Sequence, residues 1–365
     1  MSISFKAKDY IEKINPYKQG KSKINSKEKP IKLSSNENAL KTSPTAIEAY
    51  INHRDDLYLY ADGNCSDLKN AVANKFNINP NQIVFGAGSD EIIALLIQSF
   101  VSEGEEVIYS EYGFLMYPIS AQKFGAKAVV SRETNLTTNV DNILAKISNK
   151  TRMIFIANPN NPTGSYIKKK EIERLINNTP KNIIIVLDLA YAEFVDLDED
   201  EYPDVVNLVN KNENVVMTRT FSKIYGLASL RLGWSYSCEY IADILNKSRG
   251  PFNVTGAAMQ AGIAAIQDDK FITKSVEHNN KWLKILRDEL DKINIKTYPS
   301  IANFILIDFT NETNCQKANE FLLENGVIVR DLKVYKLSNC LRMTIGTEEE
   351  NLKVIKLLKE FQDAK

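Results

Sequence analysis

Histidine and cysteine are scarce in this sequence, and their scarcity limits the chemistry that it can support. Only two histidines, His53 and His278, occur among 365 residues. Two imidazoles are too few for a typical histidine-based metal centre and argue against a Ser-His-Asp triad. The four cysteines lie far apart, at positions 65, 238, 315 and 340, with no CxxC spacing. We therefore expect no metal site and no disulfide framework, but reduced thiols.

A net charge of either sign and a long apolar run are also missing. Lys+Arg and Asp+Glu both number 46, so no excess of basic charge is available for nucleic acid or for an anionic membrane surface. Residues 1–10 lack the apolar run of a signal peptide, and no stretch reaches the roughly 18 apolar residues of a membrane helix. We expect a cytoplasmic protein that binds neither nucleic acid nor membrane. A lysine-rich run before residue 33 is interpreted as a solvated, flexible arm; it contains Lys18, Lys21, Lys23, Lys27, Lys29 and Lys32.

Predicted strands and helices alternate regularly from about residue 66 to 240. Ser89–Val101 is predicted to be a helix with Ser89 as its N-cap, and Lys169–Asn177 a second helix. Several predicted strands are continuous Val/Ile/Leu runs, which are typical of strands buried on both faces of a parallel sheet. They are Ile83–Phe85, Glu106–Tyr109, Lys127–Val130, Met153–Ala157, Ile183–Leu187 and Val215–Met217. This pattern predicts an α/β domain whose mainly parallel sheet is flanked by helices.

After about Pro251 the pattern changes to that of a smaller α+β domain. We predict an N-terminal arm with part of the small domain at 1–45, a large domain at 46–252 and the small C-terminal domain at 253–365. The elements expected in the C-terminal part are helices at Thr255–Gln267, Phe271–Ile293 and Thr347–Phe361, and strands at Asn303–Phe309, Val327–Val329 and Leu341–Ile345.

A lysine in an apolar, glycine-bearing segment is the most informative residue. Lys223 lies in Thr220–Leu227 (TFSKIYGL), and Arg231 follows eight residues later. Burial lowers the pKa of a lysine and makes its amine nucleophilic toward a carbonyl carbon. The planar fork of an arginine pairs with a phosphate through two hydrogen bonds. An aldehyde and a phosphate in one ligand describe pyridoxal 5′-phosphate (PLP). Taken alone, however, such a lysine is more often an exposed side chain.

Three further groups follow strands, where ligands of open α/β sheets bind. The Gly86–Asp90 turn can offer backbone N–H groups to a phosphate, although such glycines often serve turn geometry only. Asn161, in the rigid turn Asn158–Gly164 (NPNNPTG), can donate to a phenolate oxygen. Asp188 can pair with a protonated pyridine nitrogen while Tyr191 bonds the ring oxygen; a helix cap and a core aromatic are the alternatives.

These groups together resemble those of the fold-type I PLP-dependent aminotransferases. The resemblance rests on Asn161–Gly164, Asp188-x-x-Tyr191, Ser222-Lys223 and Arg231. More narrowly, the chain is similar to the histidinol-phosphate aminotransferase family from about residue 10 to 360. Supporting motifs are Asn15-Pro16-Tyr17, Leu33–Asn38 (LSSNEN), Leu59–Gly63 (LYADG), Gly88–Glu91 (GSDE) and Leu341–Thr347 (LRMTIGT).

The resemblance implies a role for each matching residue. Lys223 would form a Schiff base with PLP, Asp188 would pair with the ring nitrogen, and Tyr191 would hold the ring oxygen together with Asn161. Phe114 would stack on the ring, and Tyr60 would reach the cofactor phosphate of a neighbouring subunit, which implies a homodimer. The other phosphate contacts implied are Ala87, Gly88, Ser89, Ser222 and Arg231. The substrate contacts implied are Tyr17, Asn36, Arg330 and Arg342, with the arginines taking its anionic group.

The resemblance also implies the reaction. PLP-dependent transfer of the amino group of L-histidinol phosphate to 2-oxoglutarate would give imidazole-acetol phosphate and L-glutamate, with ping-pong kinetics, in histidine biosynthesis. An aromatic amino acid aminotransferase is an alternative because Arg342 can bind a carboxylate as well as a phosphate; a decarboxylase of a phosphorylated amino acid is more remote. A PLP-binding regulator would need a DNA-binding domain ahead of the match, where too few residues remain. A Schiff-base aldolase without PLP would not need Asp188 or Asn161.

Overall fold

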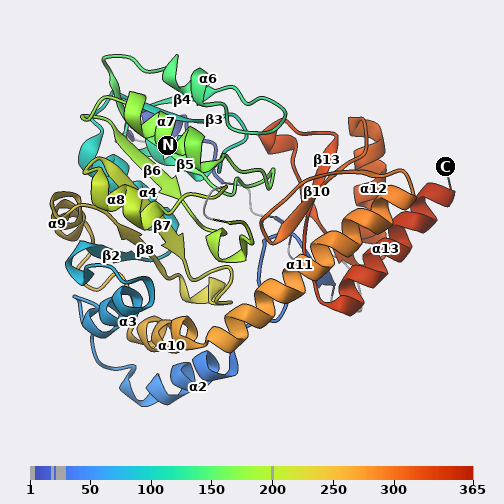
Figure 1. Cartoon of the computed structure of the whole chain (residues 1–365), viewed down its shortest axis with the longest axis horizontal. Helices are drawn as coiled ribbons and strands as arrows, with labels where there is room; N and C mark the ends of the chain where they lie inside the picture. Colours follow the sequence, from blue (N-terminus) through green and yellow to red (C-terminus); the bar gives the residue numbers. More distant parts are fainter. Residues whose placement is uncertain (1–4, 18–19, 22–29, 199–200, 365) are drawn as a thin grey trace.

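A seven-stranded and a four-stranded β-sheet organise the computed structural model, which describes residues 5–17, 20–21, 30–198 and 201–364 (Figure 1). The larger sheet has seven strands in the order β2-β8-β7-β6-β5-β3-β4; β8 is antiparallel to β2 and β7, and the other pairs are parallel. The expected mainly parallel sheet is therefore confirmed, whereas β8 was not predicted. The strands are β2 (Ile83–Gly86), β3 (Glu106–Ser110), β4 (Lys127–Ser131), β5 (Thr151–Ala157), β6 (Ile184–Asp188), β7 (Val215–Thr220) and β8 (Gly233–Tyr236).

Helices cover both faces of this sheet, and alternate residues of one strand show how. In β5, Ile154 and Ile156 belong to one buried cluster, and Met153 and Phe155 to another on the opposite face. Buried residues from α3, α6, α7, α8 and α10 share the first cluster, and residues from α4, α5 and α9 share the second. Burial on both faces explains why strands such as β2 and β6 are apolar up to their last residue. The helices are α2 (Pro44–Asn52), α3 (Ser66–Phe76), α4 (Ser89–Phe100), α5 (Met116–Lys123), α6 (Val140–Leu144), α7 (Lys169–Asn178), α8 (Val205–Lys211), α9 (Glu239–Ser248) and α10 (Gly256–Gln267).

The start of α4 differs by one residue from the prediction. Gly88, not Ser89, is the N-cap, and its φ is +90°. Residues with a side chain rarely adopt this backbone conformation, whereas glycine adopts it without steric cost. A Cβ at Gly88 would also lie 2.3 Å from Arg231 Nη2. Ser89 is therefore the first helical residue, and the glycine lets the chain turn sharply from β2 into α4.

The smaller sheet is antiparallel, in the order β12-β13-β10-β9. The long helix α11 (Asp269–Lys292) runs diagonally from α10 toward this sheet, and α13 (Glu348–Asp363) packs beside it (Figure 1). Thr347 and Glu350 form a capping box at the start of α13, as expected of a threonine three residues before a glutamate. The other elements here are β9 (Lys296–Tyr298), β10 (Phe304–Asp308), α12 (Glu312–Glu324), β11 (Val327–Ile328), β12 (Arg330–Asp331) and β13 (Cys340–Thr344).

The N-terminal segment joins the smaller sheet region rather than the larger one. After the short α1 (Asp9–Glu12), β1 (Ile31–Lys32) pairs in parallel with β11, and Leu33 packs in the cluster that contains Trp282 and Phe361. The domain boundaries at 45/46 and 252/253 stay a prediction. Lys18, Lys23, Lys27 and Lys29 of the expected arm lie outside the described residues. Among the helices described, none is long and apolar enough to cross a membrane.

Candidate active site

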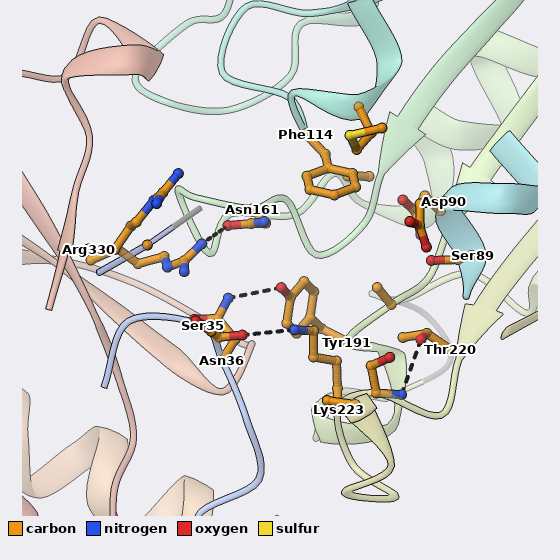
Figure 2. Close-up of a pocket in the computed structure, with 18 of the residues that line it drawn as sticks. Ser35, Asn36, Ser89, Asp90, Phe114, Asn161, Tyr191, Thr220, Lys223 and Arg330 are labelled. Carbon is orange, nitrogen blue, oxygen red and sulfur yellow. Dashed lines mark hydrogen bonds between the residues drawn. The ribbon is translucent and has the colours of Figure 1, made fainter. Parts of the chain in front are cut away.

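A cavity of about 400 Å³ lies at the carboxyl ends of three adjacent strands, β5, β6 and β7. Ala157, Asp188 and Thr220, the last residues of these strands, line it, and Arg330 and Arg342 close it from the smaller sheet. In Figure 2, Ser89 and Asp90 lie on one side of the cavity, and Asn161 and Arg330 on the other. The structure brings these sequence-predicted residues together as its lining: Tyr17, Asn36, Ser89, Phe114, Asn161, Asp188, Tyr191, Ser222, Lys223, Arg231, Arg330 and Arg342.

Lys223 follows β7, and its amine reaches into this cavity. Its Nζ donates a hydrogen bond to the carbonyl oxygen of Ser35 at 3.0 Å and lies 5.7 Å from the centroid of the Tyr191 ring. Burial, and then the positive charge of Arg342, lower the pKa of Lys223 to about 8. The uncharged fraction of the amine near neutral pH is therefore larger than in an exposed lysine, which favours action as a nucleophile or a general base.

Asp188 is a carboxylate buried at the end of β6. The hydroxyl of Tyr117 donates to its Oδ2 at 2.7 Å, and the hydroxyl of Thr218 donates to its Oδ1 at 3.2 Å. Burial raises the pKa of Asp188, and these two hydrogen bonds oppose the rise. A buried carboxylate that faces a cavity is suited to pair with a cationic group of a ligand.

Tyr191 and Asn161 lie beside the lysine and are held by side chains from distant segments. Asn36 Nδ2 donates to the hydroxyl of Tyr191 at 2.9 Å, and Arg342 Nη1 donates to Asn161 Oδ1. Burial raises the pKa of Tyr191 to about 12, so its phenol stays protonated and can donate a hydrogen bond. Two donors toward a ring oxygen are therefore available at this side of the cavity, the Asn161 amide and the Tyr191 hydroxyl.

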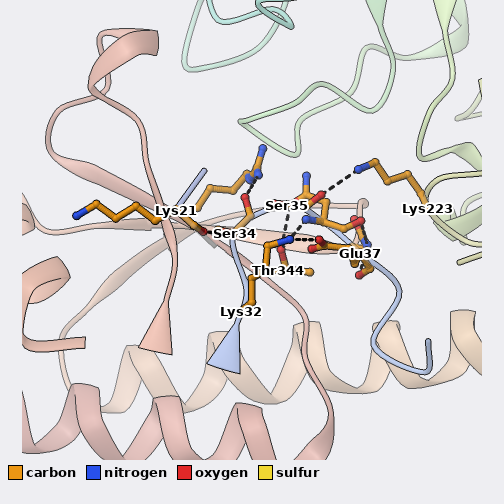
Figure 3. Close-up of polar contacts among 10 residues, drawn as sticks. Lys21, Lys32, Ser34, Ser35, Glu37, Lys223 and Thr344 are labelled. Carbon is orange, nitrogen blue, oxygen red and sulfur yellow. Dashed lines mark hydrogen bonds and ion pairs between the residues drawn. The ribbon is translucent and has the colours of Figure 1, made fainter. Parts of the chain in front are cut away.

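Residues 34–38, which we call the strap, connect the lysine to the small sheet (Figure 3). Ser34 accepts a hydrogen bond from Arg342 Nη2 through its carbonyl oxygen at 2.7 Å, and Ser35 accepts that of Lys223. The backbone N–H of Asn36 donates to Thr344 Oγ1 at 2.9 Å. The strap thus touches the amine and one arginine of the cavity within two consecutive residues, so it couples their positions.

An anion cradle lies where α4 begins. Arg231 Nη1 donates to Ser222 Oγ at 3.4 Å, and its Nη2 pairs with Asp90 at 2.7 Å. Ser89 is the first residue of the helix, whose N-terminus favours anions. Gly233 lies against this turn so closely that a Cβ there would be 2.3 Å from the backbone nitrogen of Ser89. The hydroxyls, the guanidinium and the helix N-terminus together suit a phosphate.

Two arginines form the opposite end of the cavity. Arg330 and Arg342 are neighbours across the β12–β13 pair and are only 7% and 5% exposed. The guanidinium of Arg330 lies 5.9 Å from the centroid of the Tyr17 ring, and a Cβ on Gly20 would be 3.2 Å from Arg330 Nη1. Arg342 Nε is buried without a hydrogen-bond partner. Two neighbouring buried guanidinium groups, one of them with an unpartnered donor in Arg342, suit an anionic group of a ligand.

Three of the predicted contacts do not line the cavity. The N–H of Ala87 donates to Glu91 Oε2 at 2.5 Å. Gly88 is in close contact with the side chains of Arg231 and Asp90. Tyr60 is 85% exposed and stacks on Phe252 with 4.7 Å between ring centroids. The roles that the sequence predicts for these three residues stay predictions.

Other residues of the site were missed by the sequence analysis. Ser35 and Thr218 contact the predicted residues through a backbone carbonyl and a short hydroxyl, which carry no distinctive sequence signal. Tyr117 had a signal, because it follows the expected stacking residue Phe114 by three positions and so lies on the same side of a helical turn. Its contact with Asp188, 71 positions away, could not be read from spacing.

The cavity therefore combines an amine of lowered pKa, a buried carboxylate, donors for a ring oxygen, an anion cradle and two arginines. The first four are complementary to an aldehyde, a protonated ring nitrogen, a phenolic oxygen and a phosphate, as the sequence predicted for PLP. The arginines would remain for an anionic substrate.

Comparison with known proteins agrees with this chemistry. The family model of the class I and II aminotransferases matches residues 28–358. The histidinol-phosphate aminotransferase of Paramagnetospirillum magneticum is 43% identical over 356 residues, which are 97% of this chain and 98% of that protein. The histidinol-phosphate aminotransferase of Maricaulis maris is 43% identical over 353 residues, 96% of this chain and 97% of that protein.

A solved structure shows the same fold. The crystal structure of histidinol-phosphate aminotransferase from Sinorhizobium meliloti in complex with pyridoxal-5'-phosphate aligns with a TM-score of 0.92 at 23% identity, covering 100% of this chain and 99% of that chain. The predicted fold class is thereby confirmed. Because the family model matches most of its length, this chain belongs to the aminotransferase class I and II family.

Proposed function

We infer that this chain is a PLP-dependent enzyme that transfers the amino group of L-histidinol phosphate to 2-oxoglutarate, in histidine biosynthesis. The products are imidazole-acetol phosphate and L-glutamate. The observation that carries the inference is the cavity, in which the Lys223 amine lies between an anion cradle and two buried arginines. Relatives that are 43% identical over nearly the whole chain are named histidinol-phosphate aminotransferases. The cytoplasmic location expected from the sequence stays a prediction.

The residues of the cavity fit PLP one by one. Asp188 is a buried carboxylate whose pKa is raised by burial, so pairing with a cationic ring nitrogen would relieve the cost of its charge. Ser89, Ser222 and Arg231 would hold the phosphate, and Phe114 would stack on the ring. Bound PLP supplies an aldehyde that reacts with amines and a protonated ring that takes up the electrons of a broken C–H bond.

The chain's own groups would then carry the proton transfers. Lys223 Nζ, whose pKa is about 8, would accept the proton from the substrate carbon that bears nitrogen and return it to the former aldehyde carbon of the cofactor, on the other side of that nitrogen. Tyr191 and Asn161 would hold the ring oxygen and so fix the plane in which charge develops. The carbonyl oxygen of Ser35, which accepts a hydrogen bond from Lys223 Nζ, would orient this amine once the substrate has displaced it from the cofactor.

Arg330 and Arg342 would bind the phosphate of histidinol phosphate. Both are buried at the end of the cavity opposite the anion cradle, so an anionic substrate would bridge from the lysine to the small sheet. A dianionic phosphate uses two guanidinium groups better than a carboxylate does, because it offers more acceptor oxygens. This difference is the physical basis for preferring histidinol phosphate over an aromatic amino acid.

The test is a half-reaction on the purified holoenzyme, followed by absorbance in the absence of a keto acid. L-Histidinol phosphate should convert the cofactor to its amine form, and 2-oxoglutarate should restore it. L-Phenylalanine should react at least about tenfold less efficiently, the equivalent of one lost charged hydrogen bond. Faster conversion by phenylalanine would assign the enzyme to aromatic amino acids. Release of carbon dioxide without dependence on a keto acid would instead identify a decarboxylase.

We further propose that the chain works as a homodimer. Exposed apolar side chains gather in and after α2, which packs against α10 at the lower edge of Figure 1. They are Ile47, Tyr50, Ile51, Leu57, Tyr58, Leu59 and Tyr60, with Phe252 stacked on Tyr60. An apolar group of this size is typical of a protein interface. Tyr60 lies outside its own cavity and would serve that of a second copy.

Mixing two inactive variants tests this arrangement. Lys223→Ala and Tyr60→Ala proteins are unfolded together, refolded and assayed. If Tyr60 acts in the other subunit, a mixed dimer has one site with both residues intact and activity returns. If Tyr60 acts within its own chain, every site stays defective and no activity returns. Sedimentation of the wild-type protein should also give the mass of two chains; a monomer would contradict the proposal.

A further inference from the structure

Tyr117, at the start of α5, is held rigidly between two aromatic rings. Its side chain is 1% exposed. Its ring stacks on Phe155 with 4.7 Å between centroids and an angle of 12°, and it meets Phe114 edge-on at 5.9 Å and 89°. Such pairs fix ring orientation as well as burying area. The direction of the Tyr117 hydroxyl is therefore set by packing, before any contact with the active site is considered.

That hydroxyl points at the carboxylate of Asp188. The Tyr117 Oη to Asp188 Oδ2 distance of 2.7 Å is typical of a strong hydrogen bond to a charged acceptor. Thr218 occupies the other carboxylate oxygen at the longer distance of 3.2 Å. Burial and the neighbouring Asp188 raise the pKa of Tyr117 well above that of a free phenol, so it remains a donor. The two hydroxyls together fix the carboxylate plane.

We propose that Tyr117 is a positioning residue that keeps Asp188 ionised and aimed at the protonated ring nitrogen of the cofactor. This inference rests on the proposed function, since it requires PLP in the cavity. Without the Tyr117 hydrogen bond, Asp188 would lose its shorter donor, and a neutral carboxyl group would be favoured by burial. A neutral carboxyl group no longer holds the ring nitrogen in its charged form, which the chemistry needs.

Tyr117 also connects Asp188, expected to pair with the cofactor's ring nitrogen, to Phe114, expected to stack on the cofactor ring. Its backbone N–H donates to the carbonyl oxygen of Phe114 at 3.0 Å, and Phe114 lines the cavity. One helical turn therefore carries both the residue expected to stack on the cofactor and the residue that orients Asp188. A shift of this turn would move both contacts together.

The test uses Tyr117→Phe, which removes only the hydroxyl, and two ligands of the apoenzyme. One ligand is PLP; the other is its 1-deaza analogue, in which carbon replaces the ring nitrogen. Equilibrium affinities are measured by titration of the apoenzyme, so the readout does not depend on turnover. The wild type should bind PLP more tightly than the analogue. Tyr117→Phe should lose PLP affinity by about tenfold or more, with the analogue changed less than about twofold.

Two further variants make the comparison specific. Tyr236→Phe is a matched control, because Tyr236 is also buried in the large sheet region and its hydroxyl bonds Asn210 Oδ1 at 2.6 Å, away from the cavity. It should leave the ratio of the two affinities unchanged. Thr218→Val, which removes the longer of the two hydrogen bonds, should reduce the ratio less than Tyr117→Phe. Thermal unfolding of each apoprotein verifies that the variants are folded.

The outcomes separate this inference from the proposed function. An equal loss of affinity for both ligands in Tyr117→Phe would mean that Tyr117 only packs the cavity, and would overturn the inference. An unchanged ratio would overturn it as well. A wild-type protein that binds neither ligand would overturn the proposed function itself.

Discussion

The amine of Lys223 donates a hydrogen bond to the carbonyl oxygen of Ser35, a residue 188 positions earlier in the chain, at 3.0 Å. The acceptor belongs to the strap, residues 34–38, whose other contacts reach Arg342 and Tyr191. The reactive lysine and the groups expected to bind substrate are therefore positioned by one segment. The protonated and the neutral amine both carry N–H groups, so either form can donate to this carbonyl oxygen. The contact therefore remains available while Lys223 gains and loses one proton.

Covalent capture of the cofactor should depend on Lys223. Borohydride reduction of the holoenzyme should attach the cofactor to the peptide that contains Lys223, as read by mass spectrometry. Lys223→Ala should show no attachment and a loss of activity of at least about 1,000-fold, because a nucleophile and a base are removed together. Lys69→Ala is the matched control, since burial also lowers the pKa of Lys69. Attachment to any other lysine would contradict the assignment.

The pH dependence of the free energy of unfolding of the apoprotein should reflect the lowered pKa of Lys223. Its pKa is about 8 in the folded chain and 10.5 in the unfolded chain, so between these values the unfolded state binds more protons. The contribution of Lys223 is then unfavourable below pH 8 by about 3 kcal/mol, fades as the pH rises and vanishes above 10.5. The free energy of unfolding of wild type minus that of Lys223→Met should therefore rise from pH 8 to 10.5. A difference that falls in this window would refute a lowered pKa.

Arg342 should contribute to substrate binding more than its charge alone suggests. Its guanidinium donates to Asn161 Oδ1 and to the carbonyl of Ser34, two contacts that a lysine cannot make together. Arg342→Lys should lower kcat/KM for L-histidinol phosphate by about 100-fold, which steady-state kinetics would measure. Arg174→Lys, at an exposed ion pair, should change nothing measurable. A normal kcat/KM in Arg342→Lys would remove Arg342 from the substrate site.

The turn before α4 should tolerate no side chain. In Gly88→Ala the new Cβ would lie 2.2 Å from Asp90 Oδ1 and 2.3 Å from Arg231 Nη2, which would displace the anion cradle. Gly104 is a matched control because its φ is +80° and a Cβ there meets nothing within 4 Å. Gly104→Ala should cost only about 1 kcal/mol of backbone strain. Gly88→Ala should cost about 1–3 kcal/mol more in thermal unfolding and should weaken PLP binding. Equal behaviour of the two variants would argue against a packed cradle.

Much of the large sheet could be predicted from the sequence, for a physical reason. Residues 153–157 of β5 and 184–187 of β6 are buried on both faces, so both stretches are continuously apolar. Polar residues follow directly, Asn158 after β5 and Asp188 at the end of β6. Asp188, the last residue of β6, was found because a carboxylate directly after such a run is conspicuous. β8 was missed: it is short, and its antiparallel pairing with β2 and β7 leaves no distinct local pattern.

The sequence by itself determined which chemical groups are available: one lysine in an apolar segment, a carboxylate after a buried strand, and arginines in the C-terminal part. Their order and motifs were enough to indicate the cofactor and the family. Only the tertiary structure decided which groups meet. The strap reaches Lys223, Tyr117 reaches Asp188, and Arg342 reaches Asn161 across 188, 71 and 181 positions. Contacts at such separations depend on how sheets and helices pack, because local spacing constrains only residues within the same element.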